Sequence, residues 1–159
     1  MITTTQVSYP ILIAGKHGKF GFRNAASKLV ERTESLRRLN DVDWFQLVDR
    51  EFNLYRMQNL KAVAGAGRWG GYFFEGPFLS RKVVYQADLQ PLKKLRLDEV
   101  IEIILGYMRA AQGFRKRDEI MFRAKLAEAS SELNHLDDVK TFYESLKWGD
   151  QAEDNDEDQ

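Results

Sequence analysis

The sequence predicts an α+β protein, in which a mainly antiparallel N-terminal sheet, arranged as a meander, is packed by C-terminal helices. Before Pro91, apolar residues recur in short runs with the two-residue period of strands, and glycine or proline separates the runs. After Pro91 they recur with the 3.6-residue period of helices. Because the strands precede the helices without βαβ alternation, we expect the helices to cover one face of the sheet.

The first two strands are expected at residues 7–14 and 19–23. Pro10 lacks the N–H group that a sheet ladder needs, which favours an edge position or a strand end for the first run. Residues 15–18 begin and end with glycine and predict a turn between the two strands.

Residues 25–39 allow two interpretations. Leu29, Leu36 and Leu39 fit the apolar stripe of an amphipathic helix, whereas the polar residues 31–35 also suit a strand. We predict a helix here.

The meander continues with runs rich in apolar and aromatic residues. These are residues 44–48, 54–57, 62–64, 72–75 and 81–87. Turn signals separate them at residues 49–53, at the glycine-rich residues 65–71 and at Gly76-Pro77.

Three helices are predicted after the sheet, at residues 97–108, 118–133 and 137–146. The first has a continuous apolar stripe, formed by Leu97, Val100, Ile101, Ile104, Leu105 and Met108. Gly113 ends this helix. Acidic residues near the start of each helix favour the positive end of its dipole.

Charge divides the chain into a body and a tail. All 24 lysines and arginines lie in residues 1–149 with only 18 of the 24 acids, which is a net charge of +6. The last ten residues hold six acids and no aromatic or β-branched residue, so they cannot bury enough surface to offset their ordering entropy. We predict one α+β domain at residues 1–149 and a disordered acidic tail at residues 150–159.

The composition favours a cytoplasmic protein. There is no cysteine, which excludes disulfides and thiolate metal sites. The N-terminus lacks a basic segment, and the longest apolar runs are too short to cross a membrane.

Three short motifs resemble functional sites, but each has a simpler explanation. Gly65, Gly67 and Gly70 match the G-x-G-x-x-G spacing of dinucleotide sites, but an extended aromatic segment follows where those sites need a helix. The G-x-x-G pattern at residues 15–18 lies between strands, whereas nucleic-acid clamps of that pattern join helices. Glu132 and His135 form half of a di-iron motif, and a helix-terminal His135 is the better interpretation.

These readings leave no residue to nominate for a catalytic, cofactor or metal site. An enzyme with an unrecognised site stays an alternative. A second alternative is a nucleic-acid-associated accessory protein, in which the acidic tail competes for a basic patch formed by Arg115, Lys116, Arg117 and Arg123. These residues also suit the ordinary role of solvating helix ends.

Residues 68–79 hold five aromatic side chains among glycines and prolines. Aromatics and arginines are the usual anchors of protein interfaces. The candidate partner-binding residues are Arg68, Trp69, Tyr72, Phe73, Phe74 and Phe78. Two interpretations stay open: the aromatics pack over the sheet edge, which we favour, or they are exposed to bind a partner.

Three segments carry a loose resemblance to small bacterial α+β proteins that act as immunity or inhibitor partners of toxins. They are residues 45–56, residues 94–100 at the start of the first C-terminal helix, and residues 138–143. The resemblance transfers no functional residue. The aromatic segment and the scarcity of catalytic groups predict a non-catalytic protein-binding module with another protein as its partner, and the resemblance implies the immunity or inhibitor type.

Overall fold

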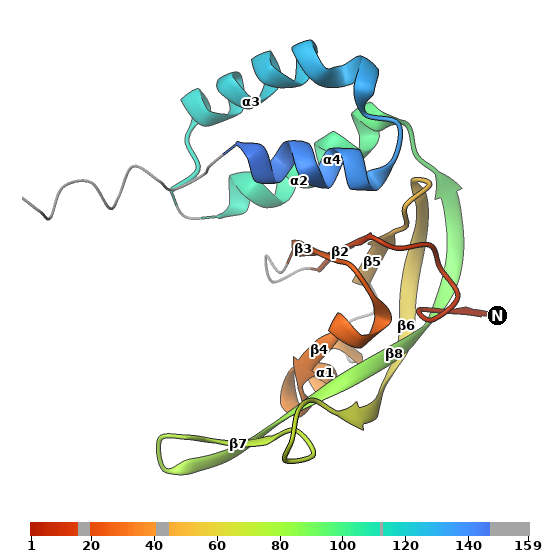
Figure 1. Ribbon diagram of the computed structural model, residues 1–159, viewed down its shortest axis with the longest axis vertical. Coiled ribbons are helices and arrows are strands. Elements are labelled where there is room, and N and C mark those ends of the chain that lie inside the picture. The colour runs from red at the N-terminus through yellow and green to blue at the C-terminus, as the bar shows by residue number, and fades with distance from the viewer. Residues whose placement is uncertain (16–19, 41–44, 112, 147–159) are drawn as a thin grey trace, which may run out of the picture.

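A computed structural model describes residues 1–15, 20–40, 45–111 and 113–146. A curved antiparallel sheet lies below a layer of three helices, and a long hairpin projects from the opposite end of the sheet (Figure 1). Most of the predicted turn at residues 15–18 and the whole predicted acidic tail lie outside the described residues.

The described residues form eight strands, and every pairing between them is antiparallel, as the sequence predicts. The sheet order is β1-β8-β6-β5-β2-β3, with β4 and β7 each paired to β8. The strands are β1 (Ile2–Thr3), β2 (Ile11–Ala14), β3 (Phe20–Arg23), β4 (Val30–Arg32), β5 (Phe45–Val48), β6 (Asn53–Gly65), β7 (Tyr72–Glu75) and β8 (Phe78–Lys94). Strand β2 starts directly after Pro10, in agreement with the predicted strand end.

Strands β6 and β8 are much longer than the sequence predicts, and they are the two longest strands of the sheet. They pair from Asn53 opposite Lys94 to Gly65 opposite Val83, with three register shifts along the way. One shift adjoins the pairing of Tyr55 with Pro91, where a proline without an N–H group is tolerated. Exposed charged residues interrupt the apolar alternation along both strands, so the alternation predicts strands that are too short.

The three C-terminal helices agree with the prediction. They are α2 (Leu97–Ala110), α3 (Lys116–Ala129) and α4 (Leu136–Ser145), with a short 3-10 turn η2 (Ser130–Glu132) before the last. The apolar stripe of α2 is buried through Val100, Ile101, Ile104, Leu105 and Met108. It packs on side chains of β2 and β5, so the helical layer covers one face of the sheet.

The predicted helix over residues 25–39 is wrong in its first half. The chain forms a 3-10 turn η1 (Ala26–Lys28), then β4, and only afterwards the helix α1 (Thr33–Asn40). Val30 pairs with Val84 of β8, and the carbonyl of Leu29 accepts from the backbone N–H of Tyr85. Tertiary pairing with β8 therefore overrides the local helical spacing of the leucines.

The sheet has a hydrophobic core on each face, whereas the sequence predicted cover on one face only. In β2, Leu12 belongs to the core beneath the helices, and its neighbours Ile11 and Ile13 belong to the second core. The second core is closed by Leu29 and by Leu36 of α1, both buried. The segment that was predicted as one helix thus supplies the cover for this face.

A buried aspartate organises the turn between β5 and β6. Asp49 Oδ1 accepts the backbone N–H groups of Glu51 and Asn53, both at 2.9 Å. Its Oδ2 accepts the side-chain amide of Asn53 at 3.0 Å and the hydroxyl of Tyr55 at 3.2 Å. These four hydrogen bonds hold Phe52 in the left-handed conformation, with φ 65°, while its ring is buried in the core.

The same turn connects the sheet to the helices. The carbonyl of Phe52 accepts the N–H of Leu95 at 2.8 Å, immediately before α2. The carbonyl of Arg50 accepts the N–H of Leu136 at 2.9 Å, at the start of α4. The guanidinium of Arg50 also donates twice to the carboxylate of Asp137 and lowers its pKa.

We expect Asp49→Ala to lower the free energy of unfolding by roughly 2–4 kcal/mol, because it leaves four donors without their acceptor. Urea denaturation of the full chain measures this change. Glu144→Ala is the control, since among the described residues Glu144 forms a partly exposed ion pair with Lys140, and its loss should cost less than about 0.5 kcal/mol. Equal losses for the two variants would contradict the role given to Asp49.

Candidate functional site

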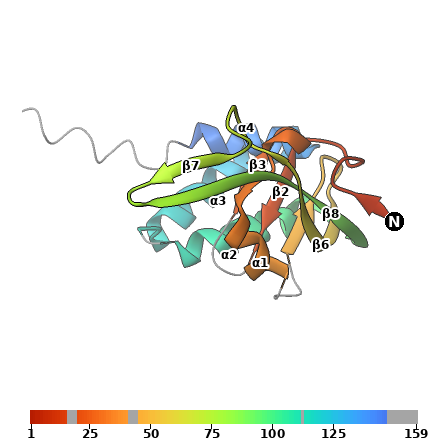
Figure 2. The same cartoon turned by 90° about the horizontal axis from the view of Figure 1, so that it is seen from below.

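The projecting hairpin is the candidate site, and we call residues 66–82 the arm. It consists of a loop at residues 66–71, strand β7, a two-residue turn and the first part of β8. Figure 2, seen from below, shows β7 and β8 here as a two-stranded ribbon. Its register pairs Tyr72 with Arg81 and Phe74 with Leu79.

Glycines allow the backbone of the arm to turn and to cross tightly. Gly76 has φ 61° at the first position of the Gly76-Pro77 turn, which is typical of a type II′ hairpin turn. A side chain at Gly71 would overlap the carbonyl of Lys82, whose backbone is hydrogen-bonded to Gly71 and Ala66. The glycine-rich segment is thus a connection between strands, as predicted, and strand β7 stands where a dinucleotide site needs a helix.

The two faces of the arm differ. Because side chains alternate along strands, Tyr72, Phe74, Leu79 and Arg81 share one face, which we call the free face. Phe73, Glu75, Phe78 and Ser80 share the other, which we call the anchored face.

Strand β4 holds the anchored face in place. Arg32 Nη2 donates to Glu75 Oε1 at 2.8 Å, and its guanidinium lies 5.8 Å from the centre of the Phe73 ring. The ammonium group of Lys82 lies 5.3 Å from the same ring. These contacts orient the arm relative to the sheet.

Four large apolar side chains of the arm are strongly exposed. The exposed fractions are 82% for Trp69, 83% for Phe74, 72% for Phe78 and 58% for Leu79. The favoured interpretation of the sequence, packing over the sheet edge, is therefore wrong. The reason is the length of β8, which carries the hairpin past the sheet to a place where no other described element lies over it (Figure 1).

The arm brings together the six residues that the sequence nominated for partner binding. The sequence did not nominate Leu79 and Arg81, which lie on the same face as Tyr72 and Phe74. Counting alternate positions outward from the Gly76-Pro77 turn would have found both, because the turn fixes which residues are opposite each other. The missing step was to recognise β7 and β8 as one hairpin.

Two cations of the arm, Arg81 and Lys82, lie beside aromatic rings. The Arg81 guanidinium lies 5.1 Å from the centre of the Tyr72 ring, and its Nε donates to the carbonyl of Gly70 at 3.3 Å. As far as the described residues go, no carboxylate pairs with Arg68, Arg81 or Lys82. The arm therefore combines exposed rings with positive charge.

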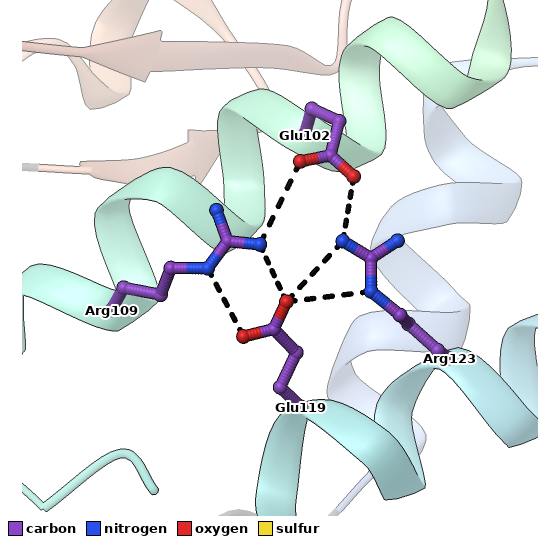
Figure 3. Close-up of polar contacts among 4 residues, drawn as sticks. All are labelled: Glu102, Arg109, Glu119 and Arg123. Carbon is purple, nitrogen blue, oxygen red and sulfur yellow. Dashed lines mark hydrogen bonds and ion pairs between the residues drawn. The ribbon is translucent and has the colours of Figure 1, made fainter. Parts of the chain in front are cut away.

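The predicted basic patch is partly neutralised. Figure 3 shows Arg123 of α3 between two carboxylates, with Nη2 donating to Glu102 of α2 at 2.7 Å and to Glu119 at 3.3 Å. Arg109 of α2 donates to both oxygens of Glu119 and completes the network. Arg123 thus helps to join α2 to α3, while Arg115, Lys116 and Arg117 are exposed at the start of α3.

Other candidate sites are weaker. His135 is the residue before α4, as predicted, and its Nδ1 lies 3.3 Å from Glu51. In the part of the chain that the structure describes, no three histidines or carboxylates form a metal-binding group. A hollow of about 230 Å³ beside β6 and β8 includes Tyr55 and Lys93, but their polar groups already bind Asp49 and Glu99.

Comparisons with known proteins identify no relative. No family model, no curated protein and no solved structure matches the chain. None of the described helices is long and apolar enough to cross a membrane.

We expect the helix network to weaken in acid. The hydrogen bond from Arg109 lowers the pKa of Glu119 from 4.5 to about 2. The contribution of the Glu119 carboxylate to folding stability is therefore complete above about pH 4.5 and is lost as the pH falls towards 2. The Tm of Glu119→Gln should be below that of the wild type at pH 7, and the difference should narrow over this pH window.

Calorimetry at several pH values measures the difference. Glu128→Gln is the matched control on the exposed side of α3 and should differ little from the wild type at any pH. A Tm difference for Glu119→Gln that stays constant down to pH 2 would contradict the assignment.

Proposed function

We propose that this chain is a non-catalytic protein-binding module of immunity or inhibitor type, and that it inserts the arm into a cleft of a partner protein. The exposed apolar side chains on a projecting hairpin support this function most directly. Tryptophan, tyrosine and arginine are enriched among the residues that dominate binding energy, and the arm has all three.

The structure of the arm suits an insertion. All of its rings except that of Trp69 lie on paired strands, and Arg32 of β4 contacts the Phe73 ring and Glu75. Few conformations of these side chains are therefore lost on binding. Arg81 is held against Tyr72 and Gly70, which lowers the entropy that its immobilisation would cost. A partner with an apolar cleft and an acidic rim would match these groups.

The basic patch that the sequence nominated for nucleic-acid binding does not coincide with the arm. The basic residues nominated for phosphate contacts lie on α3, at the opposite end of the molecule from the aromatic arm (Figure 1). Single-stranded nucleic-acid sites need both features in one groove. The network in Figure 3 also occupies Arg123 with two carboxylates.

Co-purification of the tagged full chain from its native host should yield one protein in stoichiometric amount. We expect Trp69→Ala to weaken this complex at least about tenfold, because Trp69 is 82% exposed in the free protein and becomes buried in the complex. Isothermal titration with the purified partner measures the loss.

Ile120→Ala is the matched control, since Ile120 is 62% exposed but lies on α3, far from the arm. It should leave the affinity unchanged. Full affinity of the Trp69→Ala variant would remove the arm from the proposed interface, and the absence of any stoichiometric protein would count against the function itself.

A further inference from the structure

We infer that two copies of the free protein pair through their arms, with the free face of one arm packed against the free face of the other. This inference rests on the proposed function, because it takes the arm as the binding surface. It names a second copy of this chain as the occupant of that surface when no other protein is bound.

The apolar area of the arm is a substantial part of what a dimer needs. Tyr72 is 48% exposed, and with Phe74, Leu79 and the neighbouring Trp69 it leaves roughly 500 Å² of side-chain surface in water. Monomers rarely expose an apolar patch larger than a few hundred Å². A standard interface buries about 800 Å² per partner, so the arm alone supplies more than half of one side.

Isolated two-stranded hairpins are marginally stable in water. Among the described residues, β7 pairs with β8 alone, and the tip of the hairpin has no third strand. The arm nevertheless places a row of three apolar side chains, Tyr72, Phe74 and Leu79, on its free face. A second layer of the same kind would bury that row, as facing sheets do elsewhere at a spacing of about 10 Å.

The charges on the free face permit an antiparallel two-fold arrangement. If the two-fold axis passes near Phe74 and Leu79, each Arg81 lies two residues from the axis, at opposite ends of the interface. At about 3.3 Å per residue the two guanidinium groups are about 13 Å apart, beyond the screening length of about 8 Å at physiological salt. The contact is then self-complementary, with apolar side chains at its centre and cations at its ends.

Of the two faces of the arm, only the free face has a row of exposed apolar side chains. On the anchored face, Arg32 and Lys82 lie beside the Phe73 ring, and Glu75 is paired with Arg32. Phe78 alone stands strongly exposed there, near the turn. Phe74 and Phe78 are therefore a matched pair, with the same side chain and similar exposure on opposite faces of one hairpin.

Sedimentation of the full chain over a range of about 1 to 200 µM tests the inference. The wild type should form a dimer within this range. Phe74→Glu should weaken the dimer at least about 100-fold, whereas Phe78→Glu and the α3 variant Ile120→Glu should sediment like the wild type. Circular dichroism verifies that each variant is folded.

Three results would overturn the pairing. They are a wild type that stays monomeric throughout, a Phe74→Glu variant that dimerises as the wild type does, and a Phe78→Glu or Ile120→Glu variant that dissociates as far as Phe74→Glu. In the first case the free face is reserved for a different protein. The proposed function would then still stand on the Trp69-dependent complex.

Cross-linking gives a second readout that keeps the free-face rings in place. The chain has no cysteine, so any protein–protein disulfide of a single introduced thiol must join two copies, and the mixed disulfide with glutathione is its precursor. With oxidised glutathione as the electron acceptor, Leu79→Cys should form a disulfide-linked dimer in which one bond joins the two arms. Ser80→Cys, one residue away on the anchored face, should not. Equal cross-linking of the two variants would reject the face-to-face arrangement.

Discussion

The fold depends on the hydrogen bonds of one buried carboxylate. Asp49 uses both of its oxygens to hold the turn between β5 and β6, and that turn presents the carbonyls of Arg50 and Phe52 to the segments that begin α4 and α2. The helical layer is therefore positioned on the sheet by polar contacts at one corner as well as by apolar packing beneath α2. Without this turn, the helical layer would lose these polar contacts to the sheet.

Strand β8 has a buried section in the sheet and an exposed section in the arm. In its middle section, alternate side chains such as Val83 and Tyr85 are buried in the second core, and β8 pairs there with β4 and β6. Its first residues leave the core and, within the described part of the chain, pair with β7 alone. A strand that is rigidly held at one end can thus present exposed rings at the other, which is the mechanical basis of the proposed binding.

The charged residues show the same division. Between α2 and α3, two arginines and two glutamates neutralise each other and join the helices (Figure 3). On the arm, Arg81 and Lys82 lie over aromatic rings. In the helical layer the charged side chains hold two helices together. On the arm they lie beside exposed apolar side chains, which favours binding of a partner protein.

The sequence by itself determined that three helices follow the sheet, that a turn precedes β6 and that residues 68–79 are rich in aromatics, because local spacing and turn residues fix these. Only the tertiary structure decided that residues 30–32 form a strand and that the rings of the arm are exposed. Both outcomes depend on β8, which supplies a pairing edge to β4 and carries the arm past the sheet. No local pattern contains that information, since burial is set by which distant element lies on top.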